Sequence, residues 1–460
     1  MKPRDYPPLL SRFAGEHAKR APKSAALHER AIQYMIDGGS NTLRLLHPFS
    51  PRLVSAKGAW VQDEDGHRIL DFWQGHHANI LGHNPEMVTR ALAEFFGEGL
   101  GLQTGFTDRL QIEAAEMICQ QTGAERVRFT TTGALATMNA IILSCAFTGR
   151  DLVMKAGGGW HGGHPWGLKG VGYHGGFAGM DSAGVPASVN DNIIITNYNN
   201  SEKLKDHFSQ YGDKLACFIV EPVIGGGGLM PAKKEYLQAA RELTQKYGVV
   251  LICDEVISGF RFRAGDATAL YGVQPDLMTL GKAIGGGMPV AAVAGRADIL
   301  SRAGKGGNVK FEGGTYAAHP ASLLAGKIFM RHLVAHETEI YPRLYATGAK
   351  LREVVTKAFA EENICARFAG DHNHDLPGNS LHMLLFPYQE GGELNTPEEV
   401  RNPAVCDLVL SEKVLQSGLL LENAFTVHGL GSNSAAHTEA DLQFLGEACR
   451  RFAKRAKSYL

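Results

Sequence analysis

The chain alternates short, continuously apolar runs with longer stretches of helical periodicity. Runs of this kind, without the alternation of a half-exposed strand, are typical of strands covered on both faces. Helices at 135–146 and 235–246 would provide that cover. Strands that alternate with helices indicate an α/β fold with a mostly parallel sheet. The strands are predicted at 127–129, 152–154, 193–195, 217–220 and 249–253.

The two ends of the chain have a different pattern from the centre. Residues 1–75 combine a polar helical lead with two short apolar stretches that Asp65-Gly66 separates, which predicts a hairpin. The C-terminal part begins with a long helical stretch. We therefore expect a large α/β domain at 76–330. Residues 1–75 and 331–460 are expected to build a smaller α+β domain together.

The C-terminal part has its own predicted elements. A strand is expected at 381–386, and a helix at 404–416 that Gly418 stops. A strand at 419–421 would follow. The last helix is predicted to begin at Thr438, with Asp441 as its capping partner, and to bury Leu442, Leu445, Cys449 and Phe452.

Composition and charge exclude several classes of protein. The 460 residues include 46 Lys and Arg against 47 Asp and Glu, so the net charge is −1. This balance predicts no nucleic-acid partner and no membrane surface as partner, and no apolar run approaches the length of a membrane span. The seven cysteines are scattered and form no C-x-x-C pair, so we expect no metal site and a reducing cytoplasm. The opening MKPRDYPPLL lacks the apolar core of a signal peptide.

Two residues at predicted strand ends are the first candidates for chemistry. Asp254 ends the apolar run 249–253, where a carboxylate is costly unless it meets a cation or a donor. Lys282 follows a second apolar stretch at 277–280 and precedes a glycine cluster. Ligands of parallel sheets bind at the carboxyl ends of the strands, so both side chains could face one ligand. The alternative is a structural ion pair or a solvated lysine.

The segment 254–261, DEVISGFR, followed by Gly281-Lys282, resembles the signature of class III aminotransferases. These enzymes use pyridoxal phosphate (PLP) and have fold type I, and the likeness is closest to the glutamate-1-semialdehyde aminomutase branch. That branch includes aminotransferases for arylglycines and β-amino acids. The resemblance covers most of the chain, and further pieces of it stand at 38–44, 63–71, 82–85, 221–223, 275–282 and 314–315.

The resemblance implies roles around the cofactor ring. Lys282 would form the Schiff base with PLP and then move protons, and Asp254 would keep the ring nitrogen protonated. Val256 would pack on one ring face and Trp160 would stack on the other. His161, next to that tryptophan, would support the cofactor environment. Taken alone, the valine is equally compatible with core packing, and a lone tryptophan is more often a core residue.

Other matches imply how the phosphate and the neighbouring subunit take part. Thr132, Gly133 and Ala134 stand where the family forms its phosphate cup, at the start of a helix whose free N–H groups bind phosphate. Without the family, this turn would be interpreted as a helix cap. Thr315 matches the threonine that the family sends to the phosphate of the neighbouring subunit. A homodimer with shared active sites is therefore implied.

The substrate contacts rest on weaker matches. Arg44, in GGSNTLR, matches the arginine that holds the substrate carboxylate, a task that suits a planar guanidinium. His76 and His77 stand where the branch lines its substrate pocket, with a satisfied core histidine as the alternative. Glu221, in EPV, is counted among the cofactor-binding positions. The ornithine-type branch pairs this glutamate with a C-terminal arginine, and 419–436 contains none.

Some positions depart from the family pattern and leave the reaction open. Leu135 stands where the family has a glutamate, and so does Gln111 further upstream. His319 belongs to the segment GTYAAHP, where the family pattern is G-T-x-S-G-N-P. We expect amino transfer between an amino acid, with aryl and β-amino acids among the candidates, and a 2-oxo acid. An aminomutase, a racemase or epimerase, or a decarboxylase would use the same residues. The glycine clusters form no nucleotide-binding motif, and a PLP-binding protein without catalysis is a minor alternative.

Overall fold

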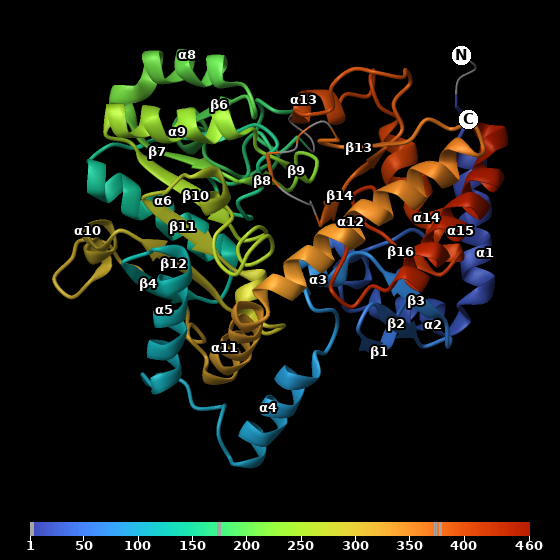
Figure 1. Ribbon diagram of the computed structural model, residues 1–460, viewed down its shortest axis with the longest axis horizontal. Coiled ribbons are helices and arrows are strands. Elements are labelled where there is room, and N and C mark those ends of the chain that lie inside the picture. The colour runs from blue at the N-terminus through green and yellow to red at the C-terminus, as the bar shows by residue number, and fades with distance from the viewer. Residues whose placement is uncertain (1–3, 173–175, 372, 374, 377–379) are drawn as a thin grey trace.

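The computed structural model describes residues 4–172, 176–371, 373, 375–376 and 380–460. Its centre is a seven-stranded sheet in the order β4-β12-β11-β10-β7-β5-β6 (Figure 1). Only β12 runs antiparallel to its neighbours, so the sheet is mostly parallel, as predicted. All five predicted strands belong to it. The strands are β4 Arg126–Thr130, β5 Leu152–Ala156, β6 Ile193–Thr196, β7 Leu215–Val220, β10 Val250–Glu255, β11 Leu277–Leu280 and β12 Ala291–Gly295.

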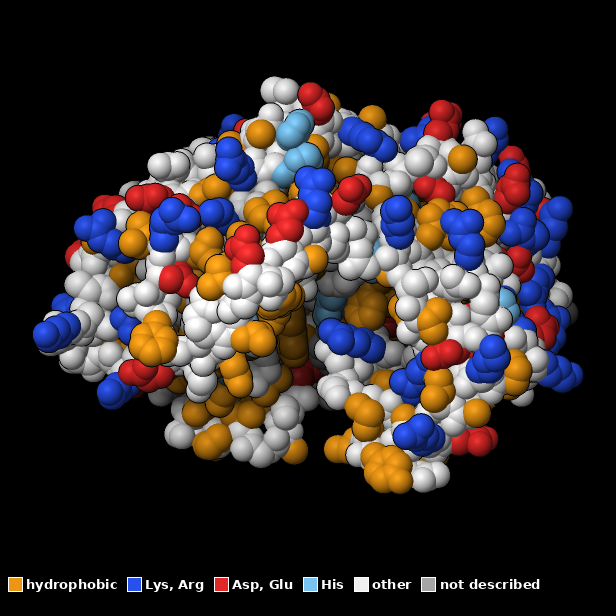
Figure 2. Space-filling view, turned by 90° about the horizontal axis from the view of Figure 1, so that it is seen from below, with side chains coloured by type: hydrophobic (Ala, Val, Ile, Leu, Met, Phe, Trp, Pro, Cys, Tyr) orange, Lys and Arg blue, Asp and Glu red, His pale blue; other side chains and the backbone are white. Residues whose placement is uncertain are grey.

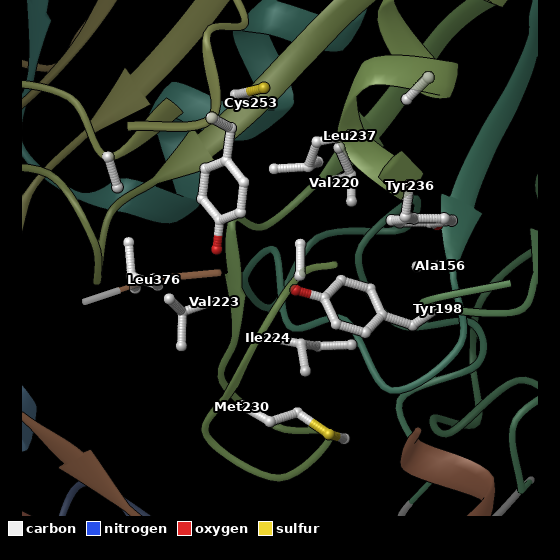
Figure 3. Packing of buried hydrophobic residues seen from close by; sticks show 14 of the residues in the cluster. Ala156, Tyr198, Val220, Val223, Ile224, Met230, Tyr236, Leu237, Cys253 and Leu376 are labelled. Carbon is white, nitrogen blue, oxygen red and sulfur yellow. The ribbon is translucent and has the colours of Figure 1, made fainter. Parts of the chain in front are cut away.

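Helices cover both faces of this sheet, which explains why its strands are continuously apolar. On one face, α6 (Gly133–Thr148) packs on inward side chains such as Val153 and Ile252. On the other, α8 (Ser201–Tyr211) and α9 (Lys234–Tyr247) pack on the alternate side chains of the same strands, which include Met154 and Leu251. Figure 3 shows this second core, in which the hydroxyl of Tyr198 points toward the loop that follows β7.

Residues from both chain ends share one apolar core. The hairpin predicted at Asp65-Gly66 is present: β2 (Trp60–Asp63) and β3 (Arg68–Asp71) pair antiparallel. They belong to a sheet of order β1-β2-β3-β16, in which β1 is Leu53–Lys57 and β16 is Ala424–Phe425. Helices α1 (Pro7–Arg20), α12 (Glu337–Ala360) and α15 (Glu439–Ala456) pack beside it, so that the first helix and the last α-helix of the chain lie side by side (Figure 1). The division at residues 75 and 330 stays a prediction.

The C-terminal helix forms as predicted. Thr438 is its N-cap, with a complete capping box to Asp441. Leu442, Leu445, Cys449 and Phe452 are all buried.

The predicted helix end at Gly418 is wrong. A π-helical segment (Leu410–Val414) continues directly into α14 (Leu415–Leu421), which passes through this glycine. A Cβ atom at Gly418 would lie 2.3 Å from Cδ2 of Phe452, so the glycine permits close packing of α14 on α15. The strand expected at 419–421 lies instead at β16. The one expected at 381–386 forms two short pieces, β14 (Leu381–His382) and β15 (Leu384–Leu385).

In the described residues, no helix is both long and apolar enough to cross a membrane. The same part of the chain contains no group of three or more His, Cys, Asp or Glu side chains arranged to hold a metal ion. The other helices are α2 Pro22–Ala31, α3 Gln74–His77, α4 Glu86–Gly97, α5 Arg109–Thr122, α7 Ala187–Asp191, α10 Ala297–Leu300, α11 Pro320–Ala335 and α13 Pro397–Val400. The other strands are β8 Val223–Ile224, β9 Met230–Pro231, β13 Arg367–Phe368 and β17 Gly431–Ser432.

Candidate active site

A cavity of about 720 Å³ lies at the carboxyl ends of the central strands. Figure 2 shows a hollow on the face seen from below, with a basic side chain and a histidine at its mouth. All but two of the predicted site residues line the cavity; the exceptions are His77 and Thr315. The lining set is Arg44, His76, Thr132, Gly133, Ala134, Trp160, His161, Glu221, Asp254, Val256 and Lys282.

Asp254 is a buried carboxylate near the end of β10 that three donors hold in place. Its Oδ2 lies 2.8 Å from Nδ1 of His161. Its Oδ1 accepts hydrogen bonds from Oγ1 of Thr279 at 3.0 Å and from the backbone N–H of Val256 at 3.1 Å. These three contacts fix the orientation of the carboxylate, which can face a cationic ring in the cavity. Sequence reasoning missed Thr279, on the neighbouring strand β11.

Lys282 begins a short 3-10 turn directly after β11, with a left-handed backbone φ of 44°. Such a conformation is strained for a residue other than glycine and is found at functional sites. Burial lowers the pKa of Lys282, while the charges of Asp254 and Glu221 act in the opposite direction. A lowered pKa increases the fraction of neutral amine, which is the nucleophilic form.

The start of α6, at Thr132, Gly133 and Ala134, forms another wall of the cavity, which we call the cradle. Thr132 is the N-cap, and its Oγ1 accepts the backbone N–H of Leu135 at 3.3 Å. A Cβ atom on Gly133 would lie 2.9 Å from Cγ1 of Val256, so this glycine lets the valine and the helix start approach each other. The first N–H groups of a helix lack helical acceptors and can bind an anion.

The loop after β5 carries Trp160 and His161 into the cavity. Its backbone is held by Lys155, whose fully buried Nζ donates to the carbonyls of Gly159 at 2.9 Å, Gly167 at 3.0 Å and Lys169 at 2.8 Å. Burial lowers the pKa of Lys155 to about 8, and burial also lowers that of His161. Sequence reasoning missed Lys155. Its position at the end of an apolar strand, before a glycine-rich loop, was the available signal.

Glu221 fixes the same loop from the other side. Its Oε1 accepts the backbone N–H of Trp160 at 2.8 Å, and its Oε2 accepts that of Gly225 at 2.9 Å. Burial raises the pKa of Glu221 to about 8, and the nearby Asp254 charge adds to the shift. Tyr198, labelled in Figure 3, donates its hydroxyl to the carbonyl of Glu221 at 3.1 Å.

A second cavity, of about 640 Å³, adjoins this one. Arg44 and His76 line both cavities. Burial and the charges of Lys282, His428 and Arg44 lower the pKa of His76 to about 3, so its imidazole is neutral. His77 is fully buried outside the lining of either cavity, and its Nδ1 has no hydrogen-bond partner in the described part of the chain.

Thr315 is exposed and does not line the cavity of its own chain. A Cβ atom on the preceding Gly314 would lie 3.7 Å from the side chain of Thr131, so the segment runs past the cradle. The three departures from the family pattern lie in helical first turns or caps. Leu135 and Gln111 are half-buried, and His319 is the N-cap of α11.

These residues fit the PLP group that the sequence resemblance implies. The buried carboxyl group of Asp254 suits a protonated ring nitrogen, and Lys282 supplies an amine. Val256 provides an apolar surface beside the helix start, and that start provides N–H groups for a phosphate. The cavity thus joins a nucleophilic amine, a buried carboxylate and an anion cradle, a set that defines an enzyme with an organic cofactor.

Comparisons with known proteins place this enzyme in a family. The class III aminotransferase family matches residues 47–366, and the chain belongs to it. A relative from Laribacter hongkongensis named glutamate-1-semialdehyde 2,1-aminomutase is 35% identical over 436 residues, which are 93% of this chain and 98% of the relative. A relative of the same name from Caldicellulosiruptor saccharolyticus is 31% identical over 446 residues, which are 95% of this chain and 99% of the relative.

Solved structures support the same fold. An omega-transaminase from Sphaerobacter thermophilus superposes with a TM-score of 0.84 at 29% identity, covering 96% of this chain and 99% of the other. A beta-phenylalanine aminotransferase from Variovorax paradoxus gives 0.83 at 26% identity, with 98% and 97% covered. The fold is therefore that of the fold type I PLP enzymes, as predicted.

Proposed function

We propose that the protein is a PLP-dependent aminotransferase that moves an amino group between an amino acid and a 2-oxo acid, both small molecules. The enzyme class and the cofactor follow from the family; the reaction and the residue roles are our proposal. The observation that carries it is the pair Asp254 and Lys282, at the ends of adjacent strands and facing one cavity that Arg44 also lines.

When bound, PLP supplies an electron sink for the charge that develops on the substrate carbon. Asp254 would hold the proton on the ring nitrogen, because a buried carboxylate favours the charged ring. Lys282 would move the substrate proton with its amine. Val256 and Trp160 would enclose the ring faces, with His161 beside Asp254.

The other roles concern binding. The backbone N–H groups of Thr132, Gly133 and Ala134 would hold the phosphate. Arg44 would bind the substrate carboxylate, with His76 beside it. Glu221 would act through the backbone of Trp160, which it holds. His77 stays a predicted substrate contact, although its side chain does not line the cavity.

We further propose a homodimer and a cytoplasmic location. Several large apolar side chains are almost fully accessible in the single chain, among them Tyr34 at 81%, Ile36 at 86%, Leu102 at 78% and Phe106 at 79%. Exposure on this scale fits a surface that another subunit covers. The seven cysteines are free thiols, which fits a reducing compartment.

The test follows the amino group itself. The holoenzyme is incubated with ¹⁵N-labelled amino acids, including aryl and β-amino acids, together with an unlabelled 2-oxo acid, and label in the acceptor is measured by mass spectrometry. We expect transfer with at least one donor. Lys282→Ala should lower the rate by roughly 10²–10⁴-fold or more, while Lys310→Ala, an exposed lysine that is 94% accessible, should not change it.

The other outcomes identify other reactions. The names of the curated relatives favour an aminomutase as the second candidate, which would move nitrogen within one substrate and leave the added acceptor unlabelled. Deuterium uptake into recovered substrate without transfer would indicate a racemase or epimerase. Release of carbon dioxide would indicate a decarboxylase. Full activity of Lys282→Ala would overturn all of these proposals.

A further inference from the structure

The wall that carries His76 is a one-turn left-handed helix. All four residues of α3 (Gln74–His77) have positive φ, at 46°, 62°, 61° and 68° in chain order. The turn closes with hydrogen bonds from the N–H of His77 to the carbonyl of Trp73 at 2.9 Å and from that of Asn79 to Gln74 at 3.0 Å. Only one of the four residues is a glycine. L-residues avoid this conformation, so the surrounding structure must hold it in place.

Asp71 holds the start of the turn. Its Oδ1 accepts the backbone N–H of Trp73 at 2.8 Å, and its Oδ2 accepts that of Gln74 at 2.9 Å. The side chain of Gln74 donates in return to the carbonyl of Asp71 at 2.9 Å. Nε2 of His83 lies 2.7 Å from the same Oδ2 and fixes the orientation of the carboxylate. The first half of the turn is therefore tied to the end of β3.

Arg261 holds the end of the turn. Its side chain is fully buried, and its guanidinium donates to the carbonyl of His77 and, at 3.2 Å, to Oγ of Ser380. In the described part of the chain, neither of its acceptors is a carboxylate, and its Nε has no hydrogen-bond partner. Burying a cation beside neutral acceptors is costly, so the position that its hydrogen bonds fix needs an explanation. Arg261 belongs to the loop that follows Asp254 on β10.

The turn decides where one side chain of the substrate wall lies. His76 lines both cavities beside Arg44, and its ring centroid lies 5.2 Å from that of Trp73. Its neutral imidazole can donate one hydrogen bond and accept another. In a right-handed or extended backbone, the side chain would leave this place, since its direction depends on φ and ψ.

We propose that Arg261, acting with Asp71, is a positioning residue for substrate binding: it holds the left-handed turn so that His76 faces the substrate beside Arg44. This inference rests on the proposed function, because it assumes a substrate carboxylate at Arg44. It links the cofactor side of the site, where Asp254 lies, to the substrate side through one hydrogen bond to the backbone.

The first measurement tests, without any reaction, whether Arg261 holds the left-handed turn; we call this contact the clamp. Hydrogen–deuterium exchange of the holoenzyme is followed in peptides that span residues 72–80. Arg261→Met removes the donors and keeps an apolar side chain of similar length, and we expect the N–H groups of His77 and Asn79 to exchange about tenfold faster or more. Arg261→Lys, which keeps a cation, should restore part of the protection and serves as the second variant if the first does not fold.

The matched control is Arg263→Met. Arg263 lies two residues further along the same loop and donates to Gln121 at 3.0 Å and to Asp266 at 3.3 Å, away from the turn. Its substitution should leave exchange in 72–80 unchanged. Unchanged exchange in both Arg261 variants would overturn the clamp, whatever reaction the wild-type enzyme performs.

The second measurement tests the link to the substrate. With the best donor of the labelling experiment, Arg261→Met should raise KM about tenfold or more and change kcat less, because the chemistry at Lys282 is left intact. His76→Ala should do the same, and the double variant should be no worse than either single one, since both act through the same side chain. Additive losses, or an unchanged KM, would overturn the positioning role. The proposed function is judged on the wild-type enzyme alone, so the two failures are distinguishable.

Discussion

At the scale of single residues, the buried Lys155 links its own protonation to the stability of the fold. Its ammonium donates to three backbone carbonyls and is fully buried, and these bonds hold the loop that carries Trp160. Burial lowers its pKa to about 8. Between this value and the ordinary lysine value, the unfolded chain binds more protons than the folded one, so folding stability from this group rises with pH.

We therefore predict a pH-dependent difference between wild type and Lys155→Met. As the pH rises from about 8 to about 10, the wild type should gain stability relative to the variant by up to about 3 kcal/mol. The measurement is urea unfolding of both proteins at several pH values. Lys310→Met, which removes an exposed ammonium, should follow the wild-type curve. Parallel curves for wild type and Lys155→Met would contradict the expected shift.

Residue patterns predict some site residues and not others for physical reasons. Asp254 and Lys282 could be found because each follows an apolar strand, and the edge of a parallel sheet brings such ends together. Lys155 carries a similar signal, because it lies near the end of an apolar strand before a glycine-rich loop, although the carbonyls that it holds do not show in the pattern. Arg261 could not be found, because the backbone carbonyl that it contacts belongs to His77, far away along the chain. The left-handed turn at Gln74–His77 carries a single glycine, so local propensity gives no sign of it.

At the scale of elements, the central strands were predictable because their continuous apolar runs report burial on both faces. Helix ends were less so. Gly418 has the character of a helix stop, yet α14 continues through it because the ring of Phe452 needs the space that a side chain would fill. Tertiary packing overrides the local signal at this position. Thr438 and Asp441 form a cap that depends on neighbouring residues alone, and that end was predicted correctly.

This interpretation of Gly418 predicts the sign of two alanine substitutions. Gly418→Ala should lower the free energy of unfolding by about 1–3 kcal/mol, because the new methyl group overlaps the ring of Phe452. Gly15→Ala, within α1 and with no atom within 4 Å of the added Cβ, should raise it by up to about 1 kcal/mol. Thermal unfolding of both variants is the measurement. If Gly418→Ala stabilised the protein as Gly15→Ala does, the close approach would be disproved.

At the scale of the whole molecule, two features point beyond a single chain. Figure 1 shows that α4 and the segment between α4 and α5 extend away from the body, and that segment contains the exposed Leu102 and Phe106. Thr315 lies exposed outside the cavity of its own chain. Both observations are explained if a second copy covers the apolar side chains and receives Thr315 at its own phosphate cradle.

The proposed sharing of active sites makes a prediction about mixed dimers. Lys282→Ala and Thr315→Glu should each be inactive alone, the second because a carboxylate would repel the phosphate. When the two chains are co-expressed, a mixed dimer has one site with both defects and one with neither. Random pairing should therefore restore about a quarter of the wild-type activity, measured with the labelled donor on the purified mixture.

The control for this experiment uses two residues of the same cavity. Lys282→Ala co-expressed with Asp254→Asn should restore nothing, because Lys282 and Asp254 line one cavity of one chain and each site of the mixed dimer then keeps one defect. Recovery with Thr315→Glu but not with Asp254→Asn requires that Thr315 acts across the interface. Equal recovery in both mixtures would mean that the recovered activity has a cause other than Thr315 acting across the interface. No recovery in either mixture would mean that Thr315 acts only in its own subunit. Sedimentation of the mixture at the mass of two chains shows that the comparison is made on dimers.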